Sequence, residues 1–319
     1  MQQLSNFLLK LSRGALEKPS NEFKDWAISE TRNLIPFDSC VWFTGRWINE
    51  TPVAHIVHLY NLPDNFLENW LQFQHEDKLA RDVTIHSNRA FNVDVFHEYK
   101  NTDIYDHHCK IHGVEHIVAT GSIDPDTRLV NSICLYRSNI DHPFTEQERA
   151  LKEILFQHLI EAARTNWLTN LPNMFSAYQR SSFNALAACD GSGLLHVAMP
   201  SFVEICRTEW PLWKGPSLPQ AILDAISDQK YVGQSIVISI FRTHELTLLR
   251  ARAKIPADTL SSRELEIARH ISDGCDYKTI AINLDISPST VKTHTNNIYL
   301  KLGINDKARL GIELGKLSH

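Results

Sequence analysis

The 319-residue sequence has no long apolar run and little excess of either charge. Its apolar stretches are a few residues long, whereas a transmembrane helix needs about 20. The N-terminal segment MQQLSNFLLKLSRG does not predict a signal peptide, because its short apolar run is interrupted by Lys10 and follows no basic segment. We therefore expect a cytoplasmic protein with no membrane partner.

Cysteine, glycine and proline are also used sparingly. The six cysteines are far apart and form no C-x-x-C pair, which favours free thiols over a disulfide framework. The 12 glycines and 13 prolines show no period, which excludes collagen-like and low-complexity chains. With 43% hydrophobic and 22% charged residues, the chain is globular and long enough for two or three domains. A net charge of −5 argues against a protein that coats nucleic acid nonspecifically, but it allows a local basic surface.

The sequence predicts a multidomain protein. We expect an α+β sensor domain over residues 1–168, a smaller α+β domain over 175–252 and an all-α, four-helix domain over 256–319. The seven tryptophans all lie before the last boundary, which is marked by the segment AKIPADTL. The pair Leu171-Pro172 is expected to follow the end of a helix.

Short strand patterns alternate with polar loops in the first region. Candidate strands are Cys40–Phe43 and Val53–Tyr60, and a hairpin is expected over His116–Arg137 with its turn at Asp124–Thr127. A T-x-x-E capping box then opens a helix at Thr145. Its apolar stripe is a candidate dimer contact. The stripe comprises Leu151, Ile154, Leu155, His158, Leu159, Ala162 and Ala163.

The second region also predicts an α+β unit. A strand over Phe183–Cys189 is expected to turn tightly and return over Leu194–Val197. A short helical stretch around Phe202–Cys206 follows, and the strands Ser235–Phe241 and Glu245–Ala251 close the unit.

Four capped helices are predicted after residue 260. Ser261 and Glu264 form a capping box, Asp276 caps the second helix, and Ser287 followed by Pro288 starts the third. Two short helices with a brief turn between bracing helices have the layout of a helix-turn-helix.

The third helix, over 287–302, contains two lysines and no carboxylate, although basic and acidic residues balance over 257–319. This favours insertion beside phosphates. The side chains expected on its exposed face carry hydrogen-bonding groups suited to base edges and phosphates. They are Ser289, Thr290, Lys292, Thr293, Thr295 and Asn296.

This C-terminal region resembles the LuxR/FixJ-type helix-turn-helix. The matching motifs are S-x-R-E at 261–264, G-x-x-x-K-x-I-A at 274–281, I-S-x-x-T-V-K-x-H at 286–294 and I-Y-x-K-L-G-I at 298–304. The resemblance implies a sequence-specific transcriptional regulator that binds double-stranded DNA as a homodimer and contacts RNA polymerase if it is an activator. The sequence departs from the common pattern at Thr279, Thr293 and Asn296, which puts the operator sequence in doubt.

The resemblance also implies roles for residues of the third helix. Lys292, Thr293 and Asn296 are expected to face base edges. The residues expected at or near the DNA backbone are Thr290, Val291, His294 and Lys301.

The rest of the chain resembles the sensor regions of a subset of these regulators. Residues 112–149 look like the end of a GAF-like domain, and D-x-x-G-x-L at 190–195 looks like part of a PAS-like module. The N-terminal region contains no strand that ends in paired acidic residues, the pattern that would suggest a phospho-acceptor domain. Control by a small-molecule effector is therefore expected rather than control by phosphorylation.

Four aromatic residues are candidates for a ligand pocket: Trp42, Tyr60, Trp70 and Phe73. Acyl-homoserine-lactone receptors of the same superfamily carry aromatics and an Asp-Pro pair in such a stretch, but Val83 follows Asp82 here. The alternative is that these are ordinary core aromatics.

A histidine-rich stretch spans His107–His116. His108, His112 and His116 would share one face of a helix and are candidate ligands for a metal or haem, the alternative being scattered loop histidines. No Ser/His/Asp order, carboxylate cleft or phosphate-binding glycine loop is evident, so we expect neither an enzyme nor a cofactor. Two other functions stay open: a sensor or adaptor that acts through protein contacts, and a metal-binding enzyme built on the histidines.

Overall fold

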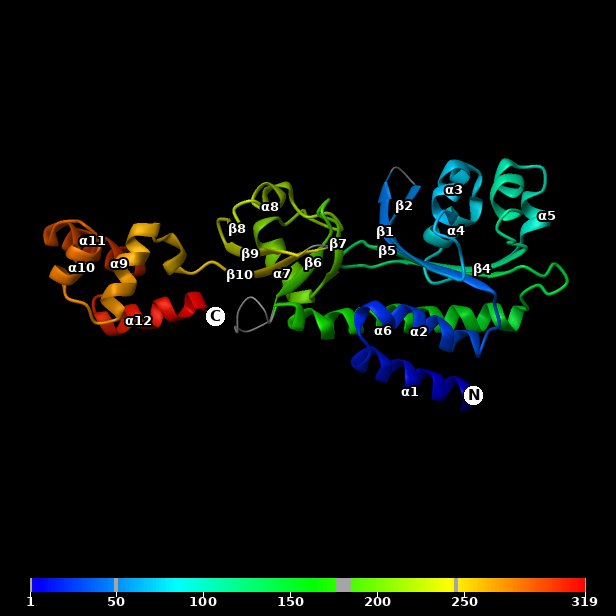
Figure 1. Cartoon of the computed structure of the whole chain (residues 1–319), viewed down its shortest axis with the longest axis horizontal. Coiled ribbons are helices and arrows are strands. Elements are labelled where there is room, and N and C mark those ends of the chain that lie inside the picture. Colours follow the sequence, from blue (N-terminus) through cyan, green and yellow to red (C-terminus); the bar gives the residue numbers. More distant parts are fainter. Residues whose placement is uncertain (1, 49–50, 176–184, 244–245, 319) are drawn as a thin grey trace.

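The computed structural model describes residues 2–48, 51–175, 185–243 and 246–318. Two α+β units and an all-α C-terminal unit lie in a row, which confirms the expected fold class (Figure 1). Residues 183, 184 and 245, at the starts of two predicted strands, lie outside the described residues. Within the described ranges, no helix has both the length and the apolar character needed to cross a membrane.

The first unit is built on a five-stranded antiparallel sheet in the order β2-β1-β5-β4-β3. Its strands are β1 (Ser39–Ile48), β2 (Thr51–Tyr60), β3 (Ala90–Asp94), β4 (His116–Ile123) and β5 (Val130–Arg137). Both candidate strands and the hairpin are therefore confirmed.

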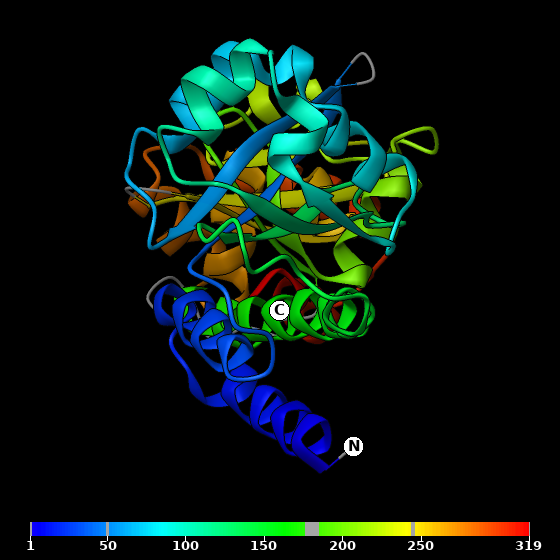
Figure 2. The same cartoon turned by 90° about the vertical axis from the view of Figure 1, so that its right-hand side faces the viewer.

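Helices cover both faces of this sheet (Figure 2). One face packs against α1 (Gln2–Glu17), α2 (Ser20–Arg32) and α6 (Glu146–Phe175). The other carries α3 (Phe66–Phe73), α4 (Lys78–Ile85) and α5 (Val95–Tyr99), with short turns at Gln74–Glu76 and Tyr105–Cys109. Because side chains alternate along a strand, Trp42 of β1 enters the first core and its neighbours Val41 and Phe43 enter the second.

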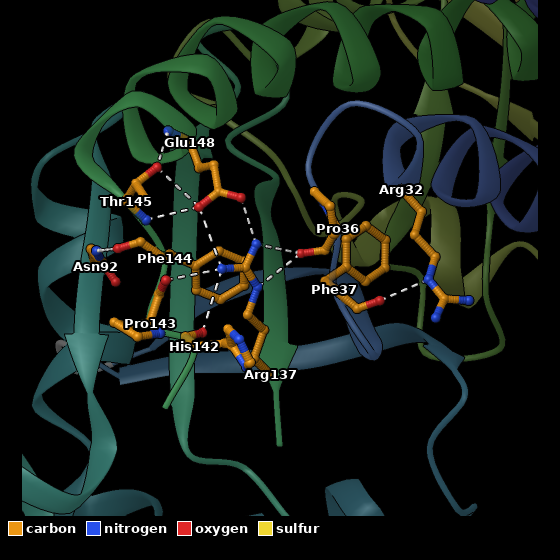
Figure 3. Close-up of polar contacts among 10 residues, drawn as sticks. All are labelled: Arg32, Pro36, Phe37, Asn92, Arg137, His142, Pro143, Phe144, Thr145 and Glu148. Carbon is orange, nitrogen blue, oxygen red and sulfur yellow. Dashed lines mark hydrogen bonds and ion pairs between the residues drawn. The ribbon is translucent and has the colours of Figure 1, made fainter. Parts of the chain in front are cut away.

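The start of α6 is anchored by one arginine at the end of β5 (Figure 3). Arg137 forms an ion pair with Glu148, donates to the Pro36 carbonyl and covers the Phe144 ring at 4.0 Å. The Thr145 backbone N–H donates to Glu148 and the Glu148 N–H donates to the Thr145 hydroxyl, which confirms the capping box. Arg137 therefore ties the end of the sheet to the first turn of α6 and to the loop that precedes β1.

Helix α6 is longer than expected and serves both units. The predicted end before Leu171 is wrong, since the helix continues through Pro172 to Phe175. Leu171 is fully buried with Leu186 and Leu248 of the second unit. Burial of this side chain offsets the backbone hydrogen bond that a proline removes from a helix.

The apolar stripe of α6 is not a free dimer surface. Leu155, Leu159, Ala162 and Ala163 lie in the core beneath the first sheet, so the candidate dimer contact is wrong at these positions. Ile154 is exposed, and it lies on another side of the helix.

The second unit contains a five-stranded antiparallel sheet in the order β7-β6-β10-β9-β8. Its elements are β6 (Leu186–Cys189), β7 (Leu195–Ala198), α7 (Pro200–Glu209), α8 (Gln220–Asp224), β8 (Lys230–Val232), β9 (Ile236–Arg242) and β10 (Thr247–Ala253). Leu129 of the first unit packs into this core. Arg46 donates to the Ser217 hydroxyl at 3.1 Å, so the two units share polar as well as apolar contacts.

The C-terminal unit is a bundle of short helices around its own apolar core. Its elements are η3 (Pro256–Thr259), α9 (Ser262–Ser272), α10 (Tyr277–Asn283), α11 (Pro288–Leu302), α12 (Lys307–Gly315) and η4 (Lys316–Ser318). Arg252 at the end of β10 forms a double ion pair with Asp258 of η3, both contacts being 2.6 Å. This pair anchors the first turn of the helical unit to the second sheet.

Candidate nucleic-acid interface and ligand cavity

Helix α11 begins and ends at the residues that the sequence indicated. The Ser287 hydroxyl accepts from the Thr290 N–H at 3.1 Å, and Pro288 occupies the first helical position, where its missing N–H costs nothing. Gly303 ends the helix with a φ of 65°, a left-handed conformation that favours glycine.

One face of α11 is exposed and polar. Ser289, Lys292, Thr293 and Asn296 are exposed, and the neighbouring Thr290 and His294 are half-buried. Asn297, which was not among the predicted contact residues, is also exposed; its position one turn after Thr293 was the sequence signal for it.

Two residues expected at this surface are buried instead. Val291 has 0% exposure and packs in the core, so its expected position at the DNA backbone is wrong for its side chain. Thr295 has 1% exposure and donates to the Val291 carbonyl at 2.8 Å. These two continue the apolar stripe of Ile298 and Leu302 at helical spacing, which explains why they face inward.

Lys301, which was predicted to lie at the DNA backbone, forms an ion pair within the domain. Its ammonium lies 2.7 Å from the carboxylate of Glu264, which also accepts from the Ser261 N–H at 2.8 Å. Burial alone would raise the pKa of Glu264, but the hydrogen bonds from Lys301 and Ser261 outweigh it and lower that pKa. Lys301 therefore fixes the far end of α11 to the first turn of α9.

The turn between α10 and α11 is fixed by a second residue of the S-x-R-E motif. The Arg263 guanidinium donates to the Leu284 carbonyl. Asp285, the next residue, has a φ of 51°, which an aspartate tolerates better than most residues. Arg263 therefore positions the turn before α11. It belongs to the S-x-R-E motif, but the sequence alone did not indicate this role.

The exposed face of α11 is electrostatically suited to a polyanion. The helix has no carboxylate, and Lys292 has no ion-pair partner in the described part of the chain. Hydroxyl and amide groups surround this lysine, and such groups bond both phosphates and base edges. The geometry is that of a recognition helix presented by a helix-turn-helix.

Comparison with known proteins identifies this unit. Residues 258–312 match the model of the family described as bacterial regulatory proteins, luxR family. The C-terminal unit is therefore a luxR-family helix-turn-helix domain, as the motifs indicated.

The two sequence relatives below match only a small part of this chain, and the chain covers less than half of the length of each. The probable transcriptional regulatory protein NarL of Mycobacterium tuberculosis is 37% identical over 89 residues, which are 28% of this chain and 39% of NarL. The transcriptional activator ExpR of Pectobacterium parmentieri is 50% identical over 60 residues, covering 18% and 24% of the two chains. Among solved structures, the N-acylhomoserine-lactone-dependent factor CepR2 of Burkholderia cenocepacia aligns with a TM-score of 0.41 and 18% identity, over 51% of this chain and 94% of CepR2.

The four aromatic ligand candidates do not meet in one pocket. Trp42 and Tyr60 pack on the face of the first sheet that carries α1, α2 and α6. Trp70 and Phe73 lie on the opposite face. The four residues therefore cannot line a single pocket, because the sheet separates the two pairs.

A cavity of about 70 Å³ lies on the face that carries α3 and α4. Trp70 lines it together with mainly apolar side chains of four strands and two helices. The polar residues that line it include Asp77, Ser132 and Tyr136. A small molecule with a largely apolar body fits this lining.

Asp77 is the polar centre of this cavity. Its carboxylate accepts from the Trp70 indole N–H at 2.8 Å, from the Ala80 N–H at 3.0 Å and from the Tyr99 hydroxyl at 3.3 Å. Burial raises the pKa of Asp77, and these hydrogen bonds partly oppose the shift. Asp82, the aspartate compared with the Asp-Pro pair of lactone receptors, is exposed and does not line the cavity.

The three candidate metal ligands are not brought together. His108 and His112 have ring centroids 5.0 Å apart, and the His108 Nδ1 lies 3.0 Å from the Asn69 amide oxygen. His116 is on β4 and its Nε2 bonds the Ile140 carbonyl at 2.9 Å. Over the described ranges, no group of three or more His, Cys, Asp or Glu residues is placed to hold a metal ion. The candidate histidine cluster does not form because the chain leaves the helical turn at Gly113 and enters a strand.

Proposed function

We propose that this chain is a sequence-specific, DNA-binding transcriptional regulator whose activity is controlled by a small molecule bound in its N-terminal sensor unit. The observation that carries the proposal is the exposed, acid-free face of α11 within a luxR-family domain. The proposal assigns the chain no catalytic activity.

In this proposal α11 enters the major groove of double-stranded DNA. Lys292, Thr293 and Asn296 read base edges, because they are exposed on adjacent turns and carry donors and acceptors. Thr290 and His294, half-buried at the margin of the same face, lie beside the sugar-phosphate backbone. Ser289 and Asn297 complete the contact surface.

The regulator acts as a homodimer in this proposal. A single helix contacts few base pairs, and helix-turn-helix proteins gain specificity by placing two recognition helices on half-sites about one helical turn apart. If the protein is an activator, RNA polymerase is a further partner. Sedimentation at micromolar concentration tests the dimer: a monomer with and without operator DNA contradicts it.

The effector occupies the cavity beneath α3 and α4. Its body contacts apolar walls, and a donor group such as an amide N–H or a hydroxyl faces Asp77. The Trp70 and Tyr99 donors hold the carboxylate in place for this contact. Asp77→Asn keeps the shape of the side chain and is expected to weaken the response to an effector at least ten-fold, as a lost charge-assisted hydrogen bond does.

The decisive experiment selects binding sites from random double-stranded DNA with the full chain. We expect enrichment of a two-fold-symmetric sequence, and its loss with Asn296→Ala. Lys214→Ala, an exposed lysine on the second unit, is the matched control and should leave the enriched sequence unchanged. Binding without enrichment of any sequence would contradict sequence-specific recognition.

A further inference from the structure

The cavity beneath α3 and α4 is not the only one in the described structure. Another cavity of about 70 Å³ lies on the opposite face of the first sheet, where β1 and α6 meet β7 of the second unit. Its walls come from both α+β units, with Trp42 and Trp167 from the first and His196 from the second. Because one water needs about 10–15 Å³ of such space, the cavity has room for more than a single water molecule or ion.

A lysine without an anionic partner lines this junction cavity. Lys24 projects from α2, and in the described part of the chain its ammonium has neither a hydrogen-bond acceptor nor an ion-pair partner. The Lys24 ammonium lies over the Trp42 ring, 5.4 Å from the ring centroid. Burial lowers the pKa of Lys24 to about 8, so the side chain is still mainly charged at neutral pH. Lys24 is half-buried. An anion bound in the cavity beside this unpaired ammonium would form a charge-assisted contact that is partly shielded from solvent.

The other charged groups at the cavity leave a net positive lining. Arg164 of α6 has one acidic neighbour, Glu161, at 3.9 Å, which is the limit of an ion pair. Asp124 is the one carboxylate of the lining, and one of its oxygens accepts from the Thr127 N–H and hydroxyl at 2.7 and 2.8 Å. Burial lowers the pKa of His196 to about 4, so this imidazole is neutral at pH 7. Lys24 and Arg164 together therefore exceed Asp124 by one positive charge.

The remaining wall is apolar and aromatic. Two tryptophans line the cavity together with Ile56, Leu129 and Ile160. A single excess charge beside such a wall matches a monoanion with an apolar body better than a phosphate dianion, which needs more donors. We propose that the junction cavity is a second ligand site, which takes a small monocarboxylate with an aliphatic or aromatic body.

A molecule bound at this site would affect how the two units dock. A bound molecule touches β1 and α6 on one side and β7 on the other, so it stabilises the docked arrangement of the two units. The second unit is in turn tied to the helix-turn-helix domain through the Arg252–Asp258 pair. The existence of the site does not depend on DNA binding, so its test is independent of the proposed function.

Isothermal titration calorimetry of the full chain at pH 7 tests the proposal. The probes are hexanoate, benzoate and phenylacetate, each compared with its primary amide, which has nearly the same shape and no charge. We expect at least one acid to bind with a Kd at or below the millimolar range, and its amide to bind at least ten-fold more weakly.

Variants locate the bound acid. Lys24→Met is expected to weaken binding ten-fold or more and Arg164→Gln several-fold, while Lys24→Arg retains part of the affinity. Lys10→Met, an exposed lysine paired with Glu30 on the same helical layer, is the control and should bind like the wild type. Circular dichroism establishes whether each variant is folded. If Lys24→Met does not fold, Arg164→Gln is used to test the proposal.

Three results would overturn the proposal. The first is that no acid of the series binds. The second is that acids and amides bind equally well. The third is that binding persists in Lys24→Met and Arg164→Gln but is lost in Trp70→Phe, which would place the acid in the cavity beneath α3 and α4.

Discussion

The C-terminal domain and the first sheet unit use polar side chains in opposite ways. The helical domain turns Lys292, Thr293 and Asn296 outward and keeps a core that is almost wholly apolar. The sheet unit instead buries polar groups, among them Lys152 and His116, inside or beside its cores. The difference is consistent with the proposed function, in which the helical domain binds a partner outside the fold and the sheet unit binds a small molecule inside it.

The largest expected loss of stability comes from placing a charge inside the helical domain. Val291→Asp puts a carboxylate where exposure is 0%, among Ile267, Ile298 and other core residues. The expected loss exceeds about 4 kcal/mol, which unfolds a small domain. Limited proteolysis should then degrade the C-terminal domain selectively, and DNA binding should disappear.

Asn297→Asp is the matched control for this variant. The same carboxylate on the exposed face should change the unfolding midpoint little, since surface substitutions usually cost less than about 0.5 kcal/mol. It should still weaken DNA binding through repulsion of phosphates. A protease-resistant Val291→Asp protein that binds DNA would show that α11 does not bury this face.

The helical domain was predictable because its signals are local. Ser261, Asp276, Ser287 and Asp306 each accept the N–H three residues later, and three of these caps were identified from sequence. What local pattern did not give was the inward position of Thr295, because its hydroxyl is satisfied by the backbone of the preceding turn. A polar residue type therefore concealed a buried position.

The two cavities were not predictable from the same kind of pattern. Trp42 and Trp70 are both aromatic and both line cavities, but strand alternation and helix placement put them on opposite faces of one sheet. Lys24 and His196 are separated by most of two units in sequence and meet only when β7 docks on α6. Such sites depend on long-range register, which periodicity within a segment does not encode.

The next largest expected effect is a pH-dependent change in stability caused by Lys152 of the sheet unit. Lys152 is fully buried, donates to the Ile133 carbonyl at 3.1 Å and to the Thr120 hydroxyl at 3.3 Å, and has a pKa that burial lowers to about 8. The unfolded chain therefore binds more protons than the folded chain between pH 8 and the ordinary lysine value of 10.5. Stability should rise with pH through this window, by up to about 3 kcal/mol for this group.

Lys152→Met tests that expectation. At pH 7 the variant should melt at a higher temperature than the wild type, and the difference should shrink towards pH 10 as the lysine loses its proton. Lys24 shifts in the same direction but is present in both proteins, so it cancels from the comparison. Scanning calorimetry between pH 7 and 10 measures the difference; a gap independent of pH would contradict the buried-charge explanation.

A smaller effect tests the outward face of α11. Lys292→Ala should leave the unfolding midpoint unchanged, because the side chain has no partner within the described chain. It should cost about 1–3 kcal/mol in binding to a selected operator and relax the preference at one base position. Titration of operator and scrambled DNA at several salt concentrations measures both effects. An equal loss on both DNAs would mean that Lys292 contacts phosphate only.

The smallest effect concerns Lys301, which is partly exposed to solvent and also pairs with a buried carboxylate. Its side chain is 42% exposed, yet it pairs with Glu264, whose side chain is 7% exposed. Because the folded pKa of Glu264 is lowered, its contribution to stability is present above the ordinary value of 4.5 and is lost as the pH falls through the folded value. Lys301→Met should therefore destabilise the domain at pH 7 by about 1 kcal/mol, after allowance for screening by solvent, and should lose less stability than the wild type on acidification below pH 4.5. Lys316→Met, which removes a pair with Glu313 three residues away on the surface, should show neither change. Urea midpoints at pH 7 and pH 4 decide the matter: if both variants behave alike, Lys301 belongs to the outward face alone, and its expected phosphate contact is then its principal role.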